Sequence, residues 1–301
     1  MESVTVRVPA TTANLGPGFD CLGMALDIYN EVTVERSDTL IISISGNGVD
    51  ILPTSRENMV YRGIAAVFER LGRPIPGLRL SCKNEIPLAR GLGSSAAAVV
   101  EGLEAANFIC DEPLPQDELL IMAEGFEGHP DNVAAAIFGG CQVVVREDDK
   151  LVRAQIPLPE DLIAVLFNPD FEMPTEMSRF VLPHEVSRAD AVYNIGRVAL
   201  LVTALTTGEF SHLRIAMQDR LHQPRRQTLF PAMGSIFEAA MEAGALGVSL
   251  SGGGSSVLAL ARENGEAVGE AMTDAAKKGK IYGEARIAHL SLKRAQVVAT
   301  D

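Results

Sequence analysis

Charged and hydrophobic residues alternate along much of the first 46 positions of the chain. The alternation covers residues 3–10, 30–37 and 40–46, where many of the apolar residues are β-branched. A period of two is typical of strands that bury one face. These three segments therefore predict an antiparallel sheet at the beginning of the chain.

The period then changes to one that is typical of helices. Residues 58–72 place apolar side chains three and four positions apart and close on Gly72, a residue type that often follows the last helical turn. The rest of the first half predicts a strand, two helices and a strand, at 77–87, 94–110, 117–128 and 141–147.

A proline-rich segment at 155–162 is the best candidate for a domain boundary. It divides the chain into two predicted domains, residues 1–156 and 157–301. The second domain predicts a strand, three helical stretches, a strand–turn–strand unit and a closing segment, at 162–169, 187–243, 246–261 and 283–292.

Composition limits what these elements can do. The chain has 301 residues, of which 47% are hydrophobic, so it can bury large cores and is long enough for two domains. Its 39 acidic and 26 basic residues give a net charge of −13, which repels nucleic acids and anionic lipids. We therefore expect neither a nucleic acid nor a membrane partner, and arginines near a candidate site become informative.

The cysteines and the first residues indicate the compartment. Cys21, Cys82, Cys110 and Cys141 form no C-x-x-C pair and have no histidines at zinc-ligand spacing. The first ten residues lack the apolar core of a secretory signal, and no run approaches the 18 apolar residues of a membrane span. We expect a cytoplasmic enzyme with reduced thiols.

Residues 85–100, EIPLARGLGSSAAAVV, join a loop of small residues to the start of a predicted helix. Gly91, Gly93, Ser94 and Ser95 have little side-chain bulk, so backbone N–H groups at the helix start stay open to an anion. The segment predicts a phosphate-binding loop. It is not a P-loop, because serine rather than lysine follows Gly93.

The same loop also matches the dinucleotide fingerprint G-x-G-x-x-A at Gly91, Gly93 and Ala96. That fingerprint follows directly on a buried strand and has an acidic residue about 20 positions later. Here Pro87 interrupts the approach, and Asp111 falls in a predicted helix end and loop. A nicotinamide-dependent oxidoreductase remains the alternative from another class, and tight helix packing is the purely structural one.

Two further glycine-rich segments, 9–27 and 250–260, lie between predicted strands. In this order the three segments resemble the signature motifs of the GHMP kinase superfamily, whose middle motif P-x-x-x-G-L-G-S-S-A-A is matched from Pro87 to Ala97. Within the superfamily the chain resembles the homoserine kinase family. The narrower match is carried by residues 11–23, 127–140, 175–183 and 218–226.

The resemblance implies an α+β fold with two domains. The first would be of the ribosomal-protein-S5-domain-2-like type with a left-handed β-α-β unit, and the second ferredoxin-like; crossovers are otherwise right-handed, so the handedness comes from the resemblance alone. It further implies ATP- and Mg²⁺-dependent phosphorylation of the side-chain hydroxyl of L-homoserine in threonine biosynthesis, and a homodimer. A kinase for another small alcohol such as mevalonate, or a catalytically silent relative, remains as an alternative.

The resemblance also assigns the nucleotide site. Asn58 matches the position that contacts adenine, and Ser95 and Glu127 would hold Mg²⁺, a cation that prefers oxygen ligands, with Glu124 as the second choice. The residues of the phosphate-binding loop are Pro87, Leu88, Ala89, Arg90, Gly91, Leu92, Gly93, Ser94, Ser95, Ala96 and Ala97.

A zwitterionic acceptor needs a cation for its carboxylate and an anion for its ammonium group. The resemblance assigns the carboxylate to Arg179 and Arg226, whose planar guanidinium groups suit bidentate binding. Asn14, Asp20 and Asp131 would surround the ammonium group, and Asn132 would bind the hydroxyl. The full substrate-binding set is Asn14, Asp20, Asp131, Asn132, Thr175, Arg179 and Arg226, of which Asp131 and Asn132 would be catalytic.

Each assignment has a structural alternative. Asn14 and Asp20 could make turn hydrogen bonds, Arg225 and Arg226 could form one exposed basic pair, and Arg197 is a weaker candidate for the site. A general-base role for Asp131 is a hypothesis, because a loose transition state can be served by positioning alone. Ser255 stands where the third motif usually has proline, so we expect a looser turn there.

Overall fold

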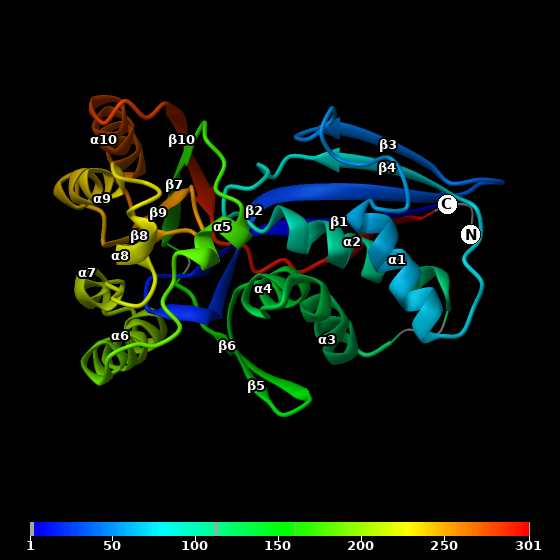
Figure 1. The fold of residues 1–301 in the computed structure, drawn as a ribbon, viewed down its shortest axis with the longest axis horizontal. Helices are drawn as coiled ribbons and strands as arrows, with labels where there is room; N and C mark the ends of the chain where they lie inside the picture. Colours follow the sequence, from blue (N-terminus) through cyan, green and yellow to red (C-terminus); the bar gives the residue numbers. More distant parts are fainter. Residues whose placement is uncertain (1–2, 112–113, 160, 301) are drawn as a thin grey trace.

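The computed structural model describes residues 3–111, 114–159 and 161–300, which form two lobes that meet along β1 and β2 (Figure 1). The strands of the first sheet are β1 (Ser3–Asn14), β2 (Gly18–Arg36), β3 (Ile41–Gly46), β4 (Leu78–Asn84), β5 (Cys141–Glu147), β6 (Lys150–Ile156) and β11 (Gln296–Thr300). They run in the order β11-β1-β2-β4-β3, with β5 paired to β2 and β6 paired to β5.

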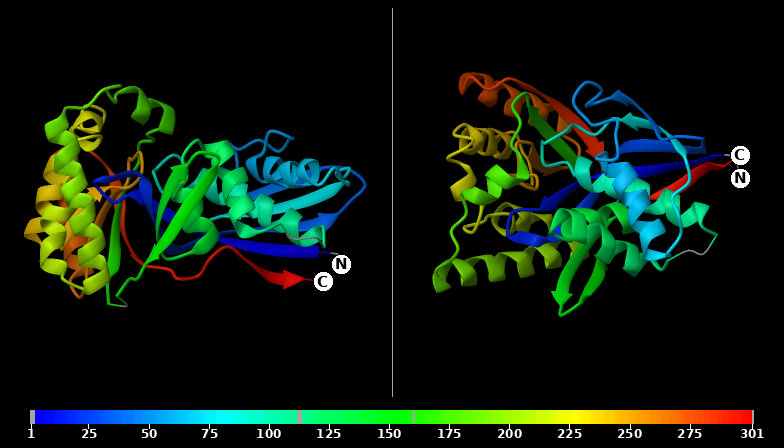
Figure 2. Two further views of the ribbon diagram at one scale, coloured as in Figure 1. Left: turned by 90° about the horizontal axis from the view of Figure 1, so that it is seen from below. Right: turned by 45° about the vertical axis from the view of Figure 1, so that its right-hand side comes forward.

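Helices cover one side of this sheet (Figures 1 and 2). They are α1 (Met59–Arg70), α2 (Ser94–Ile109), α3 (Gln116–Glu127) and α4 (Asp131–Phe138). The predicted antiparallel opening is confirmed for β1 and β2, whereas β3 pairs in parallel with β4. Because α1 lies between these two strands in the chain, β3-α1-β4 is the β-α-β unit of the first lobe.

The second sheet has four antiparallel strands, in the order β10-β7-β9-β8. They are β7 (Ile163–Pro169), β8 (Gly247–Leu250), β9 (Val257–Ala261) and β10 (Gly283–His289). The accompanying helices are α5 (Thr175–Phe180), α6 (Arg188–Thr207), the 3₁₀ turn η1 (Phe210–His212), α7 (Leu213–Ala216), α8 (Gln223–Arg226), α9 (Met233–Glu242) and α10 (Gly265–Lys278). Helices follow β7, and α10 lies between β9 and β10, so the expected ferredoxin-like arrangement is confirmed.

The last strand belongs to the first lobe. After β10 the chain returns to pair β11 with β1 in antiparallel orientation, so both ends of the described chain lie together at the far end of the first sheet (Figure 1). The division at residues 156 and 157 stays a domain prediction. The change from one sheet to the other does fall between β6 and β7, but β11 crosses back over it.

The apolar run of β7 has a physical explanation in its two buried faces. Ala164 and Leu166 pack into the core that continues through the first lobe, whereas Val165 and Phe167 pack into a second core beneath α9 and α10. A strand that is buried on both sides needs no polar alternation. The first core therefore extends across both lobes.

None of the described helices combines the length and the apolar character that crossing a bilayer requires.

Candidate active site

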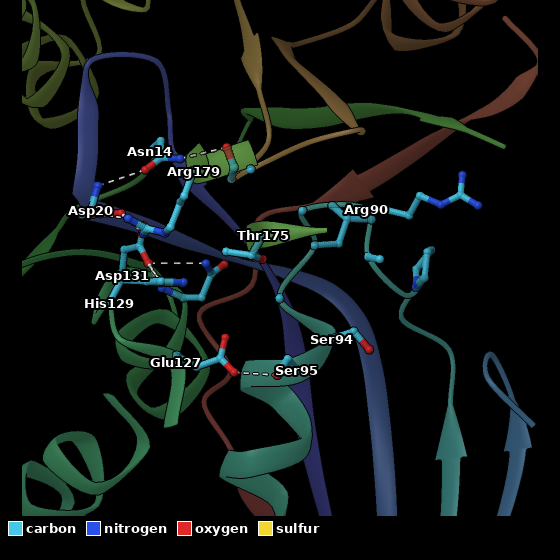
Figure 3. Close-up of a pocket in the computed structure, with 18 of the residues that line it drawn as sticks. Asn14, Asp20, Arg90, Ser94, Ser95, Glu127, His129, Asp131, Thr175 and Arg179 are labelled. Carbon is cyan, nitrogen blue, oxygen red and sulfur yellow. Dashed lines mark hydrogen bonds and ion pairs between the residues drawn. The ribbon is translucent and has the colours of Figure 1, made fainter. Parts of the chain in front are cut away.

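A cleft lies where the two lobes meet (Figure 3). The first lobe contributes the turn between β1 and β2, the small-residue loop and the starts of α2 and α4. The second lobe contributes α5, α8 and the loop after β8. All of the predicted substrate-binding residues line this cleft: Asn14, Asp20, Asp131, Asn132, Thr175, Arg179 and Arg226.

The small-residue loop leads directly into α2. Gly93 is the N-cap, with φ 70°, and within the described chain no side chain caps this helix start. The N–H groups of the first turn therefore stay available to an anion at the positive end of a 16-residue helix. A Cβ atom at Gly91 would lie 2.0 Å from Ser251 O, so the loop can pack this closely only with glycine.

The loop between β8 and β9 forms hydrogen bonds to the backbone carbonyls of the phosphate-binding loop. Ser251 Oγ lies 2.7 Å from Gly91 O, and Ser256 N donates to Arg90 O at 3.0 Å. Ser255 is fully buried, and its hydroxyl donates to Phe171 O at 2.7 Å. The looser turn that we expected from the absent proline ring is therefore offset by a hydrogen bond that proline could not make.

A second cavity adjoins the cleft and shares Ala89, Ser94, Ser95 and Thr175 with it. Its lining is mostly apolar and includes Leu88 from the loop and the N-cap residue of α1, Asn58. Both amide atoms of Asn58 are already engaged, since Oδ1 accepts from Val60 N at 3.0 Å and Nδ2 donates to Pro53 O at 2.9 Å. The contact between Asn58 and adenine stays a prediction. In this structure the Asn58 side chain forms part of the wall of the second cavity.

Three residues of the predicted loop, Leu88, Ala96 and Ala97, do not line the cleft. Ala96 and Ala97 are buried within α2 and line neither cavity. Arg90 lines the cleft, but its guanidinium extends away from the other labelled residues and donates to Asp170 O at 2.8 Å (Figure 3). From Ala89 to Ser95, every residue of the loop lines the cleft.

The predicted metal ligands meet at the start of α2 and the end of α3. Ser95 Oγ donates to Glu127 Oε1 at 2.5 Å (Figure 3). The alternative ligand, Glu124, instead forms an ion pair with Arg146 and does not line the cleft. Among the described residues, no group of three or more acidic, histidine or cysteine side chains is placed so that it could hold a metal ion by itself. Two oxygen donors fit Mg²⁺, which usually takes its other ligands from phosphates and water.

The start of α4 presents a polar group to the cleft. Asp131 is 1% exposed, and its Oδ1 accepts from Asn132 N at 2.7 Å and from His129 Nδ1 at 2.8 Å. Burial lowers the pKa of His129, but the hydrogen bond and charge of Asp131 outweigh that effect and raise it above its usual value. Thr11 Oγ1 donates to Asn132 Oδ1 at 2.8 Å, which fixes the amide plane.

Asp20 and Arg179 form a bidentate ion pair in the cleft, with N–O distances of 2.6 Å and 3.0 Å (Figure 3). Asn14 supports the pair from the turn between β1 and β2. Its Oδ1 accepts from Asp20 N at 3.0 Å, and its Nδ2 donates to Gly252 O at 2.9 Å. Asn14 therefore makes a turn hydrogen bond and also lines the cleft, so its position is compatible with both a structural and a substrate-binding role.

Arg226 lies on α8 and is 1% exposed, whereas its neighbour Arg225 is exposed. Its guanidinium donates to Ser178 O and Gly252 O. Among the described residues no carboxylate forms an ion pair with Arg226, and none accepts a hydrogen bond from its Nη2. Burial, followed by the nearby Arg179, lowers the pKa of Arg226 to about 10.

Two residues of this region were not identified from the sequence. The Phe19 ring centre lies 5.4 Å and 5.5 Å from the guanidinium carbons of Arg179 and Arg226. His222 is fully buried and contacts Arg226. His222 falls within the segment 218–226 that carries the family resemblance, but only the contact shows its position. Arg197 stays outside the cleft, where its guanidinium lies over the Tyr193 ring.

Comparison with known proteins bears on the same elements. A family model described as GHMP kinases N terminal domain matches residues 58–140, and one described as GHMP kinases C terminal matches residues 201–278. Homoserine kinase of Moorella thermoacetica is 48% identical over 275 residues, which cover 91% of this chain and 93% of that protein. Homoserine kinase of Carboxydothermus hydrogenoformans is 48% identical over 272 residues, covering 90% and 89%.

Among solved structures, a crystal structure of homoserine kinase from Cytophaga hutchinsonii matches with a TM-score of 0.89. The two chains are 33% identical, and the match covers 99% of this chain and 98% of that one. These comparisons do not favour a nicotinamide-dependent oxidoreductase or a kinase for another alcohol.

Proposed function

Because the chain belongs to the homoserine kinase family of the GHMP kinases, we propose that it phosphorylates the side-chain hydroxyl of L-homoserine with ATP. The product is O-phospho-L-homoserine, an intermediate of threonine biosynthesis. A cytoplasmic location, expected from the cysteine pattern, and a homodimer, expected from the family resemblance, are part of this proposal.

The observation that carries the proposal is the buried Arg226 guanidinium at the cleft. A buried charge is costly unless an opposite charge accompanies it. Asp20, Asp131 and Asp219 act on the Arg226 guanidinium from a distance, but within the described chain no carboxylate forms an ion pair with it. A substrate carboxylate would provide the missing charge and accept from Nη2. The site therefore favours a substrate that carries a carboxylate close to its other polar groups.

The opposite charges in the cleft suit an amino acid. Asp20 and Asp131 supply negative charge for an ammonium group, and Arg179 supplies a second cation for the carboxylate. Mevalonate carries a carboxylate but no ammonium group, so it would leave the acidic side chains unmatched. Asn132, held by Thr11, would orient the acceptor hydroxyl.

The nucleotide would occupy the adjoining cavity and the start of α2. The apolar lining around Asn58 suits a purine base, and the free N–H groups after Gly93 suit its phosphates. Ser95 and Glu127 would hold Mg²⁺, which when bound neutralises charge on the phosphate oxygens. The chain's own contribution is to place the acceptor hydroxyl in line and to exclude water.

Replacing Arg226 with alanine tests the proposal. We expect Arg226→Ala to raise the KM for homoserine about 100-fold, because a buried charge-assisted interaction is lost. The KM for ATP should stay within about threefold of the wild-type value. The matched control is Arg225→Ala, which removes the exposed neighbouring guanidinium and should change neither constant. Equal homoserine KM values for the two variants would contradict the proposal.

The assignment of Glu127 as a Mg²⁺ ligand can be tested with a matched pair of variants, Glu127→Gln and Glu124→Gln. Glu127→Gln should raise the Mg²⁺ concentration needed for half-maximal activity about tenfold, because a neutral amide is a weaker ligand than a carboxylate. Glu124→Gln should not, since Glu124 is paired with Arg146. The measurement is a magnesium titration of ADP release at fixed ATP. A larger effect for Glu124→Gln would transfer the assignment to that residue.

A further inference from the structure

His222 lies between the turn of the first lobe and the buried arginine of the second. It is fully buried immediately before α8. Its Nε2 lies 2.7 Å from Gly16 O in the turn between β1 and β2, and its Nδ1 lies 2.9 Å from Arg226 Nη1. The imidazole therefore connects the turn of the first lobe to Arg226, which lines the cleft.

These two contacts determine where the imidazole proton sits. A carbonyl oxygen only accepts hydrogen bonds, so Nε2 must carry the proton toward Gly16 O. A guanidinium only donates, so Nδ1 must offer a lone pair to Arg226. The ring is therefore neutral with one defined tautomer. Burial, together with the charge of Arg226, outweighs the opposing effect of Asp219, whose Oδ2 lies 3.7 Å from Nε2, and lowers the pKa of His222 to about 4.

The orientation of the ring is fixed by packing as well. It stacks on Phe19, with ring centres 5.2 Å apart and planes 30° apart, and Phe19 in turn lies beside the guanidinium groups of Arg179 and Arg226. The other acceptors of Arg226 are the backbone carbonyls of Ser178 and Gly252. Within the described part of the chain, His222 is the only side chain that hydrogen-bonds to Arg226.

We propose that His222 is a positioning residue, whose neutral imidazole orients Arg226 so that the free edge of its guanidinium meets the carboxylate of the substrate. This inference rests on the proposed function and extends it to a residue that does not touch the substrate. The effect of His222 should therefore act through Arg226, on the binding of homoserine rather than on that of ATP.

Three substitutions separate the two contacts of the ring. In His222→Asn the amide oxygen can occupy the place of Nδ1 and still accept from Arg226. In His222→Gln the longer side chain reaches the place of Nε2, so it can serve Gly16 but not Arg226. His222→Ala removes both contacts.

Steady-state kinetics of homoserine-dependent ADP release tests the proposal. We expect His222→Gln and His222→Ala to raise the KM for homoserine about tenfold, and His222→Asn to stay within about threefold of wild type. The kcat and the KM for ATP should change little in all three variants. In an Arg226→Ala background, His222→Ala should leave kcat/KM for homoserine unchanged, because the arginine that it positions is gone.

Several results would overturn the inference. An unchanged KM in His222→Gln, an Asn variant as impaired as the Gln variant, or an undiminished effect in the Arg226→Ala background would each exclude positioning of Arg226. If His222→Ala does not fold, as judged by circular dichroism, the contrast between Asn and Gln decides. A wild-type protein without homoserine-dependent turnover would overturn the proposed function, and this inference with it.

Discussion

The buried side chains of Arg226 and Glu101 form no ion pair with any described residue. The free-energy cost of burying a charged group is reduced differently at the two positions. Glu101 lies within α2, faces the core and has neither carboxylate oxygen hydrogen-bonded, so burial, with a smaller contribution from Glu31, raises its pKa well above the usual value. Arg226 faces the cleft and stays charged, so the anion of the substrate can compensate it.

The protonated state of Glu101 makes stability depend on pH. Because the pKa is raised in the folded state, its favourable contribution is complete below the unfolded pKa of about 4.3 and is lost as pH rises toward the folded value. Glu101→Gln removes this dependence. Thermal unfolding should show the variant gaining stability over wild type between pH 5 and pH 8, whereas Glu69→Gln, at an exposed position of α1, should show a constant difference.

A stability difference between Glu101→Gln and wild type that is the same at pH 5 and pH 8 would contradict the raised pKa, because it would mean that Glu101 ionises at the same pH in the folded and the unfolded protein.

The two possible roles of Asp131, as a general base and as a binding group for the ammonium, affect different kinetic constants. If Asp131 accepts the hydroxyl proton, Asp131→Asn should lower kcat about 100-fold at saturating homoserine. If it only binds the ammonium group, the KM should rise while kcat is largely kept. Saturation kinetics of the variant measures both constants, and nearly full turnover at saturating homoserine would exclude the base role.

At the scale of elements, the cleft depends on how closely two loops approach each other. Gly91 has φ +74° and meets the backbone of the loop between β8 and β9, whereas Gly72 has φ +65° and no atom within 4 Å of its Cβ position. Alanine at either site incurs the left-handed backbone cost of about 1–2 kcal/mol. The two positions therefore form a matched pair that isolates the contact.

Gly91→Ala should lose more stability than Gly72→Ala and should weaken ATP binding at least about tenfold, because the phosphate-binding loop must shift to admit the Cβ atom. Denaturant unfolding and an ATP titration provide the comparison. Equal losses of stability, together with wild-type ATP affinity in Gly91→Ala, would mean that the loop tolerates displacement.

The sequence predicted elements well wherever one face is buried. α1 and β4 follow their periodic patterns within a few residues. The strands that escaped prediction, β6 and β11, are largely exposed and have no apolar alternation to reveal them. β2 begins at Gly18, about 12 residues before the predicted strand, because the glycine-rich segment continues as strand after a short turn.

At the scale of the whole molecule, the site depends on contacts that no local pattern specifies. Asn14 and Gly252 are 238 positions apart yet share a hydrogen bond, and Gly252 N also donates to Ala13 O. Asn194 Nδ2 donates to Asp219 Oδ1 at 2.7 Å, which anchors α6 to the segment before α8.

The family resemblance supplied the residues of the candidate site, but not their mutual geometry. It did not predict the Asp20–Arg179 pair, the isolation of Arg226 from carboxylates or the bridge made by His222. These features arise where two lobes meet, so they follow from the tertiary structure and not from the spacing of residues along the chain.

The most direct test of the account identifies the product. The protein would be incubated with ATP, Mg²⁺ and, separately, homoserine, mevalonate, serine or threonine, and phosphorus-31 NMR would identify the phosphorylated compound. The account predicts a phosphomonoester on the side-chain hydroxyl of homoserine, formed much faster than any product of the other three acceptors. Faster phosphorylation of mevalonate, or hydrolysis of ATP without a phosphorylated acceptor, would contradict the assignment of the cleft to this amino acid.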